Sequence, residues 1–432
     1  MDKTPIGVSC LGAMANGWHP KKASFEGGFI KDMKFEKARF EAFIAQARFY
    51  GASFWRVFPY ETKWIKCWQD MFSPYQWDEV QGAWNLDTHN EPYFAVLDQM
   101  IATAGRNGIR SIFSLFDNCQ NHCAPGSNRN EKMAPWLWNT QGIRLYTNST
   151  FYSKRWTQKI GRRYGNRIDY ELCNELTVEK SNVAEVSNWM AQMADCLLRM
   201  GVLPERIHWG AEPIGDWNGD KFEIDKQRDL ITVASRILSR MPDPDHPGKT
   251  YNDFRVQDRI LCTIHNIGIY PEDDTDEDIA VQCWGNNRTR NALVSDDGQK
   301  VGKSKLNCEE DGTWRRGDYK QTYDTTLYFL KNSAGRSLKW YIESLPSNNA
   351  LPAWRDNIKA MAQACFDYYG VWPENWGKPF VPELEPITPD PVTPPIPDDG
   401  VVESEPCTLW YHLKRLNFRA AWEHLLGKHS GV

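Results

Sequence analysis

The acidic and amide side chains at the end of one apolar segment, Ile168–Glu175, are the residues of this chain best suited to chemistry. The segment reads Ile-Asp-Tyr-Glu-Leu-Cys-Asn-Glu and ends in Asn174 and Glu175. A carboxylic acid can protonate a glycosidic oxygen, and a neighbouring amide can hydrogen-bond a sugar hydroxyl. Asn-Glu pairs also occur by chance in loops, so this interpretation depends on where the segment lies in the fold. Glu175 is the first candidate for a general acid.

Short runs rich in β-branched and aromatic residues alternate along most of the chain with segments of helical periodicity. The strand-like runs lie near Gly7–Gly12, Ala52–Pro59, Ile109–Phe116, Ile168–Glu175, Arg206–Ala211, Ile260–Asn266, Asn291–Asp297 and Ser337–Leu345. Helices are predicted near Glu36–Tyr50, Pro92–Arg106, Thr150–Tyr164, Val183–Met200, Lys226–Arg240, Asp276–Gly285, Tyr319–Asn332 and Leu351–Tyr369. Eight such units specify a (β/α)8 TIM barrel, an α/β fold whose active site lies at the carboxyl ends of the strands. Glu175 would then close the fourth strand.

A doubly wound open sheet is the alternative arrangement of alternating strands and helices. Such a sheet usually carries a glycine-rich phosphate loop after its first strand. No Gly-x-Gly-x-x-Gly or Walker sequence follows any of the predicted strands. The pattern therefore favours the barrel, and no nucleotide or other cofactor is expected.

These residues resemble the barrel glycoside hydrolases whose two catalytic carboxylates end strands four and seven, especially the family 5 cellulases and mannanases. Tyr170–Glu175 is similar to their strand-four signature, in which the last Glu is the general acid/base and the Asn holds the 2-hydroxyl. Phe54–Val57 resembles the segment whose Arg steadies the nucleophile, and His265, with Tyr270 beyond it, resembles a His-x-Tyr substrate contact. The resemblance spans roughly residues 5 to 380, and Leu176 stands where a Pro usually follows the signature.

The seventh strand departs from the family pattern, because Ala292–Gly298 occupies the place of a Thr-Glu-aromatic-Gly run. Asp296 stands where a Glu nucleophile would be, one methylene shorter. The separation of the two carboxyl groups distinguishes retention, at about 5–5.5 Å, from inversion, at about 6.5–9.5 Å. Three roles for Asp296 follow. It is a nucleophile brought forward by local changes in the backbone, or a base that activates water in an inverting enzyme, or a residue without catalytic function in a barrel that binds sugar without cleaving it. Glu343 and Asp297 are the alternative second carboxylates.

Arg56 and His265 each have a structural alternative to a role at the substrate. An Arg that points into a barrel is often the counter-ion of a structural Glu such as Glu171. Either role requires a charge partner, because an isolated buried cation is strongly unfavourable. His265 is as often a hydrogen-bonded polar residue at a strand end as a substrate ligand. Both are retained here as candidate substrate-binding residues.

The chain is unusually aromatic, with 20 Trp, 17 Tyr and 19 Phe. Indole rings can stack against the apolar faces of sugars, although most aromatic side chains are expected in the core. The candidate platforms are tryptophans in predicted loops that follow strands, in particular Trp18, Trp136 and Trp217. The stretches Tyr60–Asn90 and Asp117–Asn148 are longer than ordinary barrel loops, and long loops are commonly functional. If these stretches form the walls of a cleft, they favour endo action. If they form lids over a small pocket, they do not favour endo action.

Length, charge and cysteine usage exclude several classes of protein. The 432 residues carry a formal charge of −5 without a long basic stripe, which argues against nucleic acid as the main partner. No signal peptide and no membrane span are recognisable. The 11 Cys are scattered, which favours reduced thiols made in a cytoplasm. The acidic, cysteine and histidine residues within 117–123 match no strong zinc pattern, so no metal site is expected.

A change in composition divides the chain near residue 380. Residues 1–380 form the predicted catalytic barrel, residues 381–402 an extended linker rich in Pro and acidic residues, and residues 403–432 a C-terminal amphipathic helical segment. The apolar stripe of that helix needs a cover, because a single helix of this length is marginal alone. It can fold back on the barrel, dock to a protein partner as a helix in a groove, or lie on a membrane surface. A glycan-degrading enzyme on such a stalk would suit a phage particle released by lysis.

Two function classes follow from these patterns. The first is a glycoside hydrolase that cleaves β-linked polysaccharide or oligosaccharide with two carboxylates. In this enzyme Glu175 protonates the leaving oxygen, Asn174 holds the neighbouring hydroxyl, and Asp296 is the nucleophile or base, with Arg56 and His265 ordering them. The second is a noncatalytic carbohydrate-binding or structural barrel tethered to a larger assembly.

Overall fold

Eight parallel strands are hydrogen-bonded side by side at the centre of the molecule. The computed structural model describes residues 6–10, 37–57, 73–116, 150–173, 183–211, 224–264, 293–296, 339–344 and 350–382, with isolated positions at 136–141 and 319–331. The strands are β1 (Ile6–Cys10), β2 (Phe54–Val57), β5 (Arg110–Ser114), β6 (Asp169–Glu171), β7 (Ile207–Ala211), β8 (Leu261–Ile264), β9 (Leu293–Asp296) and β10 (Lys339–Ser344). β1 is hydrogen-bonded to β2 on one side and to β10 on the other, so the strands follow one another in a ring.

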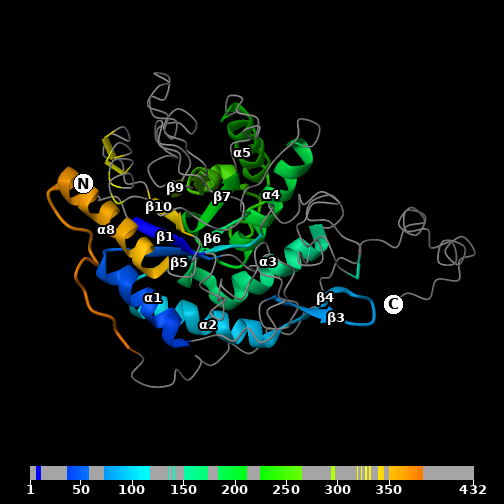
Figure 1. Ribbon diagram of the computed structural model, residues 1–432. Coiled ribbons are helices and arrows are strands. Elements are labelled where there is room, and N and C mark those ends of the chain that lie inside the picture. The colour runs from blue at the N-terminus through cyan, green and yellow to red at the C-terminus, as the bar shows by residue number, and fades with distance from the viewer. Residues whose placement is uncertain are drawn as a thin grey trace, which may run out of the picture. The chain divides into compact units, whose positions relative to one another are not determined.

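Helices follow most of these strands and lie around them (Figure 1). The described helices are α1 (Lys37–Phe49), α2 (Glu91–Arg106), α3 (Thr150–Tyr164), α4 (Val183–Arg199), α5 (Ile224–Ser239) and α8 (Ala350–Tyr369). Short 3-10 helices occupy Gly165–Arg167, Pro204–Arg206, Tyr251–Phe254 and Val256–Asp258. The prediction of an α/β fold with a parallel sheet is confirmed. The helix predicted near Asp276–Gly285 lies outside the described residues.

Side chains that alternate along the strands form two apolar regions, one on each face of the ring. On β2, Trp55 and Val57 belong to the main core between strands and helices, where Trp55 packs against Phe40 with ring centroids 5.4 Å apart. Phe54 forms a separate buried pair with Ile112 of β5. Because successive strand residues point to opposite faces, Phe54 and Ile112 belong to the inner side of the ring. The inner side is therefore where the charged residues of β2 and β6 must be accommodated.

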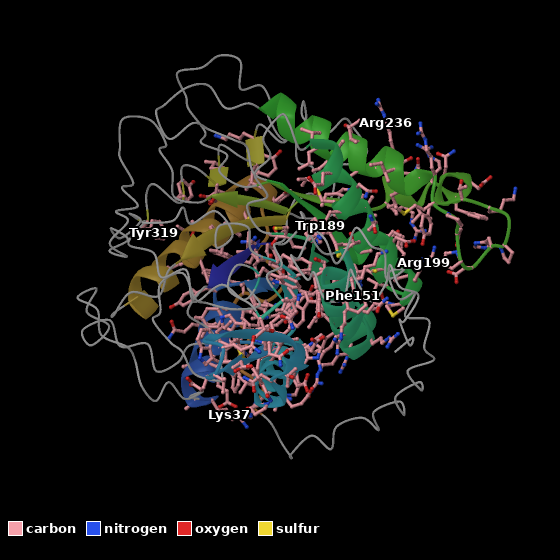
Figure 2. The ribbon with its side chains drawn as sticks, turned by 90° about the vertical axis from the view of Figure 1, so that its right-hand side faces the viewer. Lys37, Phe151, Trp189, Arg199, Arg236 and Tyr319 are labelled. Atoms are coloured by element: carbon pink, nitrogen blue, oxygen red, sulfur yellow. The ribbon has the colours of Figure 1, made fainter. Side chains whose placement is uncertain are left out.

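The amphipathic helices cover the outer side of the ring. In α4, Trp189 is 2% exposed and contacts Phe116, with ring centroids 5.1 Å apart. Arg199 on the same helix lies at the surface, where it pairs with Asp195 at 2.8 Å (Figure 2). Burial of one apolar stripe against the sheet is what stabilises such a helix.

A small two-stranded sheet was not expected from the sequence. The stretch Tyr60–Asn90 was predicted as a long loop, but its second half contains the antiparallel strands β3 (Tyr75–Asp78) and β4 (Ala83–His89). Its turn is fixed by Asp78, whose Oδ1 accepts hydrogen bonds from the backbone N–H groups of Val80 and Gln81, both at 2.9 Å. Such local side-chain bonds compete with longer-range structure and favour turns.

The segment after α8 packs against the chain just before β2 and β5, at the amino-terminal end of the ring. Asn375 Nδ2 donates to the carbonyl of Ala52 at 2.9 Å and to that of Gly108 at 3.1 Å, just before β2 and β5. Further along, Val381 N donates to Asn107 Oδ1 at 2.7 Å. We call residues 370–382 the floor segment. In barrel enzymes the site lies at the opposite, carboxyl end of the strands.

Residues 1–382 form one compact unit and residues 383–432 a second. The second unit, which contains the predicted linker and amphipathic helix, lies outside the described residues. The linker, the amphipathic helix and the phage context that rests on them stay predictions.

The ring of His89, at the end of β4, makes stability depend on pH. Burial, aided by Lys159 and Arg155, lowers its pKa to about 4 from the ordinary 6.5. The unfolded chain thus binds a proton between pH 6.5 and 4 that the folded chain excludes, so stability is full above pH 6.5 and falls as pH drops toward 4. The loss should be about 1–3 kcal/mol, because the ring is partly exposed.

Urea unfolding at several pH values between 7 and 4 checks this expectation. His89→Phe keeps the ring that stacks on Tyr75 at 5.5 Å and removes the titrating group. Between pH 7 and 4, the free energy of unfolding of the variant should fall by about 1–3 kcal/mol less than that of the wild type. Parallel pH profiles for the two proteins would contradict the assignment.

Candidate active site

Two of the candidate catalytic carboxylates, Asp296 and Glu343, lie on strands of the ring. β6 is the fourth strand of the ring and β9 the seventh. Asp296 is the last residue of β9 and is in register with Ile342 of β10. Glu343 is in register with Ser9 of β1, and Ser9 is in turn in register with Arg56. The backbone therefore places both Asp296 and Glu343 near the carboxyl ends of their strands, and nothing in the register decides between them.

A buried ion pair crosses the inner side of the ring. Arg56 of β2 donates through Nε, at 2.8 Å, and Nη2, at 2.5 Å, to Glu171 Oε2 of β6. Both side chains are fully buried. β5 lies between these two strands, so the pair spans the interior and joins strands that are not neighbours. The expected pairing of Arg56 with Glu171 is present, and in this position Arg56 orders β6 immediately before the Asn174–Glu175 pair.

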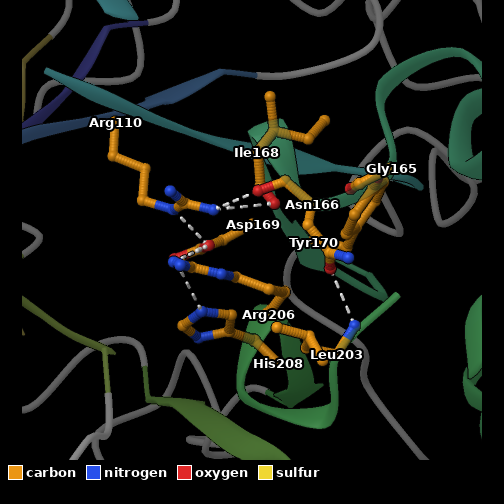
Figure 3. Close-up of polar contacts among 9 residues, drawn as sticks. All are labelled: Arg110, Gly165, Asn166, Ile168, Asp169, Tyr170, Leu203, Arg206 and His208. Carbon is orange, nitrogen blue, oxygen red and sulfur yellow. Dashed lines mark hydrogen bonds and ion pairs between the residues drawn. The ribbon is translucent and has the colours of Figure 1, made fainter. Parts of the chain in front are cut away.

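A second charged cluster surrounds Asp169 at the start of β6 (Figure 3). Arg110 Nε donates to Asp169 Oδ1 at 2.5 Å and Arg206 Nη1 donates to the same atom at 3.1 Å. His208 Nε2 lies 3.8 Å from Asp169 Oδ2. Arg110 Nη2 also donates to the carbonyl of Asn166 at 2.8 Å. The cluster lies at the amino-terminal end of the strands, so we regard it as structural.

β6 ends earlier than the sequence indicated. The strand was predicted to run from Ile168 to Glu175, but it spans Asp169–Glu171. Leu172 N still donates to the carbonyl of His208 at 3.0 Å. At Cys173 the chain leaves the ladder and crosses Gly210 of β7, where a Cβ atom would overlap the Cys173 carbonyl oxygen. A backbone this close requires glycine, so the departure is determined by the residue at position 210.

Trp136 is fully buried. Its ring packs against Tyr75 and Phe116, with centroid distances of 5.9 and 5.3 Å. These are the contacts of a core side chain, and a buried indole offers no free face to a sugar. Trp136 is therefore a core side chain and not the sugar platform that was predicted. Through these contacts it joins Tyr75 of β3 to Phe116, just after β5.

Several candidates fall outside the described residues: Trp18, Asn174, Glu175, Trp217, His265 and Asp297. Their roles stay predictions. For Asp296 and Glu343 the backbone alone is described.

Sequence reasoning missed the role of Gly210. The available signal was a glycine inside the predicted strand Arg206–Ala211, which indicates a bulge or a close backbone approach. The charged cluster at Asp169 was also missed. The signal for this cluster was a charged residue at or next to the start of three predicted strands, namely Arg110, Asp169 and Arg206.

Within the described part of the chain, no group of three or more His, Cys, Asp or Glu residues could hold a metal ion. Across the same residues, no helix is both long and apolar enough to cross a membrane. Cys173, Cys196 and Cys365 are buried cysteines.

No protein-family model matches this chain, and no curated protein matches it significantly. Among solved structures, it is similar to a native Bacteroidetes-affiliated GH5 cellulase, with 12% identity and a TM-score of 0.47, covering 86% of this chain and 96% of that one. It is similar to an endo-1,4-β-mannanase from Rhizomucor miehei, with 13% identity and a TM-score of 0.45 over 84% and 95% of the two chains. A GH5 family lichenase from Caldicellulosiruptor sp. F32 gives 12% identity and a TM-score of 0.42 over 83% and 92%. Values this low carry no argument about activity or site residues.

Breaking the Arg56–Glu171 pair should destabilise the protein strongly. Arg56→Met or Glu171→Leu alone should lower the free energy of unfolding by about 3–5 kcal/mol, because each leaves the other charge buried without this partner. In the double variant the free energy of unfolding should fall by clearly less than the sum of the losses in the two single variants. Chemical denaturation of all three variants measures the coupling.

The exposed pair of Arg155 with Asp87, at 2.7 Å, provides the control. Arg155→Ala should change the free energy of unfolding by no more than about 1 kcal/mol. Additive losses in the buried pair would show that the two charges do not depend on each other.

Proposed function

We propose that this protein is a glycoside hydrolase that cleaves β-linked carbohydrate with two carboxylates. The observation that carries the proposal is the position of the Tyr170–Glu175 motif. Its first residues lie on β6, the fourth strand of the ring, and the chain continues from there past the carboxyl end of that strand. The carboxyl ends of the strands are where barrel enzymes build their sites.

In the proposed mechanism Glu175 is the general acid. It gives its proton to the glycosidic oxygen as the bond to the anomeric carbon breaks, while Asn174 hydrogen-bonds the neighbouring sugar hydroxyl. Arg56 does not act on the substrate in this scheme. Through its bonds to Glu171 it fixes the end of β6, from which the chain continues to the two site residues.

Asp296 is the proposed second carboxylate, because it ends the seventh strand of the ring. It attacks the anomeric carbon if the two carboxyl groups are about 5–5.5 Å apart, or activates a water if they are about 6.5–9.5 Å apart. Glu343 is the alternative, since its backbone shares a register row with Ser9 and Arg56. The anomeric form of the first product, followed by NMR, distinguishes retention from inversion.

Binding without cleavage is the second candidate function. It is favoured by Asp296, whose side chain is one methylene shorter than the Glu expected at that position. This candidate requires a barrel that retains a glycan without releasing reducing ends. Endo action and cleavage of a polymer belong to the first proposal and rest on the long stretches after β2 and β5.

Glu175→Gln is expected to abolish hydrolysis with the fold intact. Removing a general acid should lower kcat by about 10²–10⁴-fold, because the amide cannot donate the required proton. Reducing-end release is measured on β-glucans, mannans, xylans and bacterial capsular or wall polysaccharides. Glu185→Gln, an exposed change on α4, is the matched control and should keep full activity. Full activity in Glu175→Gln would overturn the assignment.

Paired variants of the second carboxylate identify its position. Asp296→Asn should lower kcat by on the order of 10³-fold, whereas Glu343→Gln should change it by less than about tenfold. Both variants are assayed on the substrate that the wild type cleaves best. The opposite ranking would transfer the role to Glu343, and inactivity of both would indicate that the two carboxylates act as a unit.

A further inference from the structure

Gly210 lies on the inner side of β7, at the carboxyl end of the strand. His208, two residues earlier, approaches the inward-facing Asp169 of β6. Residues two apart along a strand share a face, so position 210 faces inward as well. Ile207 and Trp209 belong to the core between strands and helices, as the opposite face requires.

The backbone of Cys173 occupies the space that a side chain at position 210 would need. A Cβ there would overlap the Cys173 carbonyl oxygen and lie 2.8 Å from its carbonyl carbon and 3.0 Å from its nitrogen. Real Cβ atoms essentially never approach within 3.0 Å of such atoms. The obstacle is main chain, so no side-chain rotation can relieve it. A larger residue at position 210 must move the chain at Cys173.

The chain before Cys173 is hydrogen-bonded on both sides, which resists that movement. Leu115 N donates to the Glu171 carbonyl at 2.8 Å, and Leu172 N donates to the His208 carbonyl at 3.0 Å. The Glu171 side chain is fixed by Arg56. A displacement at Cys173 is therefore passed on toward the residues that follow, beginning with Asn174 and Glu175.

We propose that Gly210 is a positioning residue for the general acid Glu175. Its missing side chain lets the chain cross the inner side of β7 on the course that brings Asn174 and Glu175 to the substrate. The inference rests on the proposed function, because it assumes that Glu175 donates a proton. A displacement of about 1 Å at a reacting group can lower the rate by about 10²-fold.

Leaving-group dependence separates positioning from packing. Gly210→Ala is assayed on the phenyl and dinitrophenyl β-glycosides of the sugar that the wild type releases. The phenyl glycoside needs protonation of its leaving oxygen, whereas dinitrophenolate departs without it. kcat/KM for the phenyl glycoside should fall by about 100-fold and that for the dinitrophenyl glycoside by less than about tenfold. Glu175→Gln should show the same pattern more strongly.

Gly105→Ala is the matched control, because Gly105 lies in α2 and a Cβ there meets nothing within 4 Å. It should leave both rates unchanged. Equal losses on the two glycosides in Gly210→Ala, or no loss, would overturn the positioning role and leave the proposed function standing. Full activity in Glu175→Gln, or no cleavage by the wild type, would overturn both.

Cys173→Gly examines the same contact if Gly210→Ala does not fold. It keeps the space at position 210 and loosens the backbone that crosses it. A selective loss on the phenyl glycoside, smaller than that expected for Gly210→Ala, supports the proposal. Losses of equal size on both glycosides, or none, overturn it.

Discussion

The burial of two opposite charges inside the ring of strands is the constraint on which the rest of the structure depends. Arg56 and Glu171 are both fully buried, and an ionised group in that environment is tolerated only with a hydrogen-bonded partner. Their strands are separated by β5, so the pair can form only after three strands have taken their places. The pair therefore favours one arrangement of the strands over others that would bury the same apolar area.

The chain makes different contacts at the two ends of the ring. The amino-terminal end is occupied by the floor segment and by the arginines around Asp169. At the carboxyl end, β6 stops early and its chain turns across β7. The described contacts at the amino-terminal end hold β2, β5 and β6 in place, whereas the loops at the carboxyl ends of such strands are where barrel enzymes carry their catalytic residues.

The sequence predicted the described strands and helices well because their periodicities are local. The helix Thr150–Tyr164 was predicted with the bounds it has, and each of the eight strands overlaps its predicted run. The hairpin at Tyr75–His89 was missed because its turn is set by the side chain of Asp78 rather than by a glycine-rich pair. The end of β6 was misplaced because it depends on Gly210, a residue distant in sequence. Pairing of Arg56 with Glu171 was anticipated from charge alone, but no local pattern could have indicated that Trp136 is buried.

The bond from Asn375 to Ala52 joins residues 323 positions apart, and this has a consequence for how the chain folds as it is made. Ring closure between β1 and β10 must wait for residue 344, and the floor segment cannot dock before Val381 has left the ribosome. At about 5–20 residues per second, the first strands spend tens of seconds with unpaired edges. The nascent chain is therefore exposed to misassociation until β10 and the floor segment have emerged.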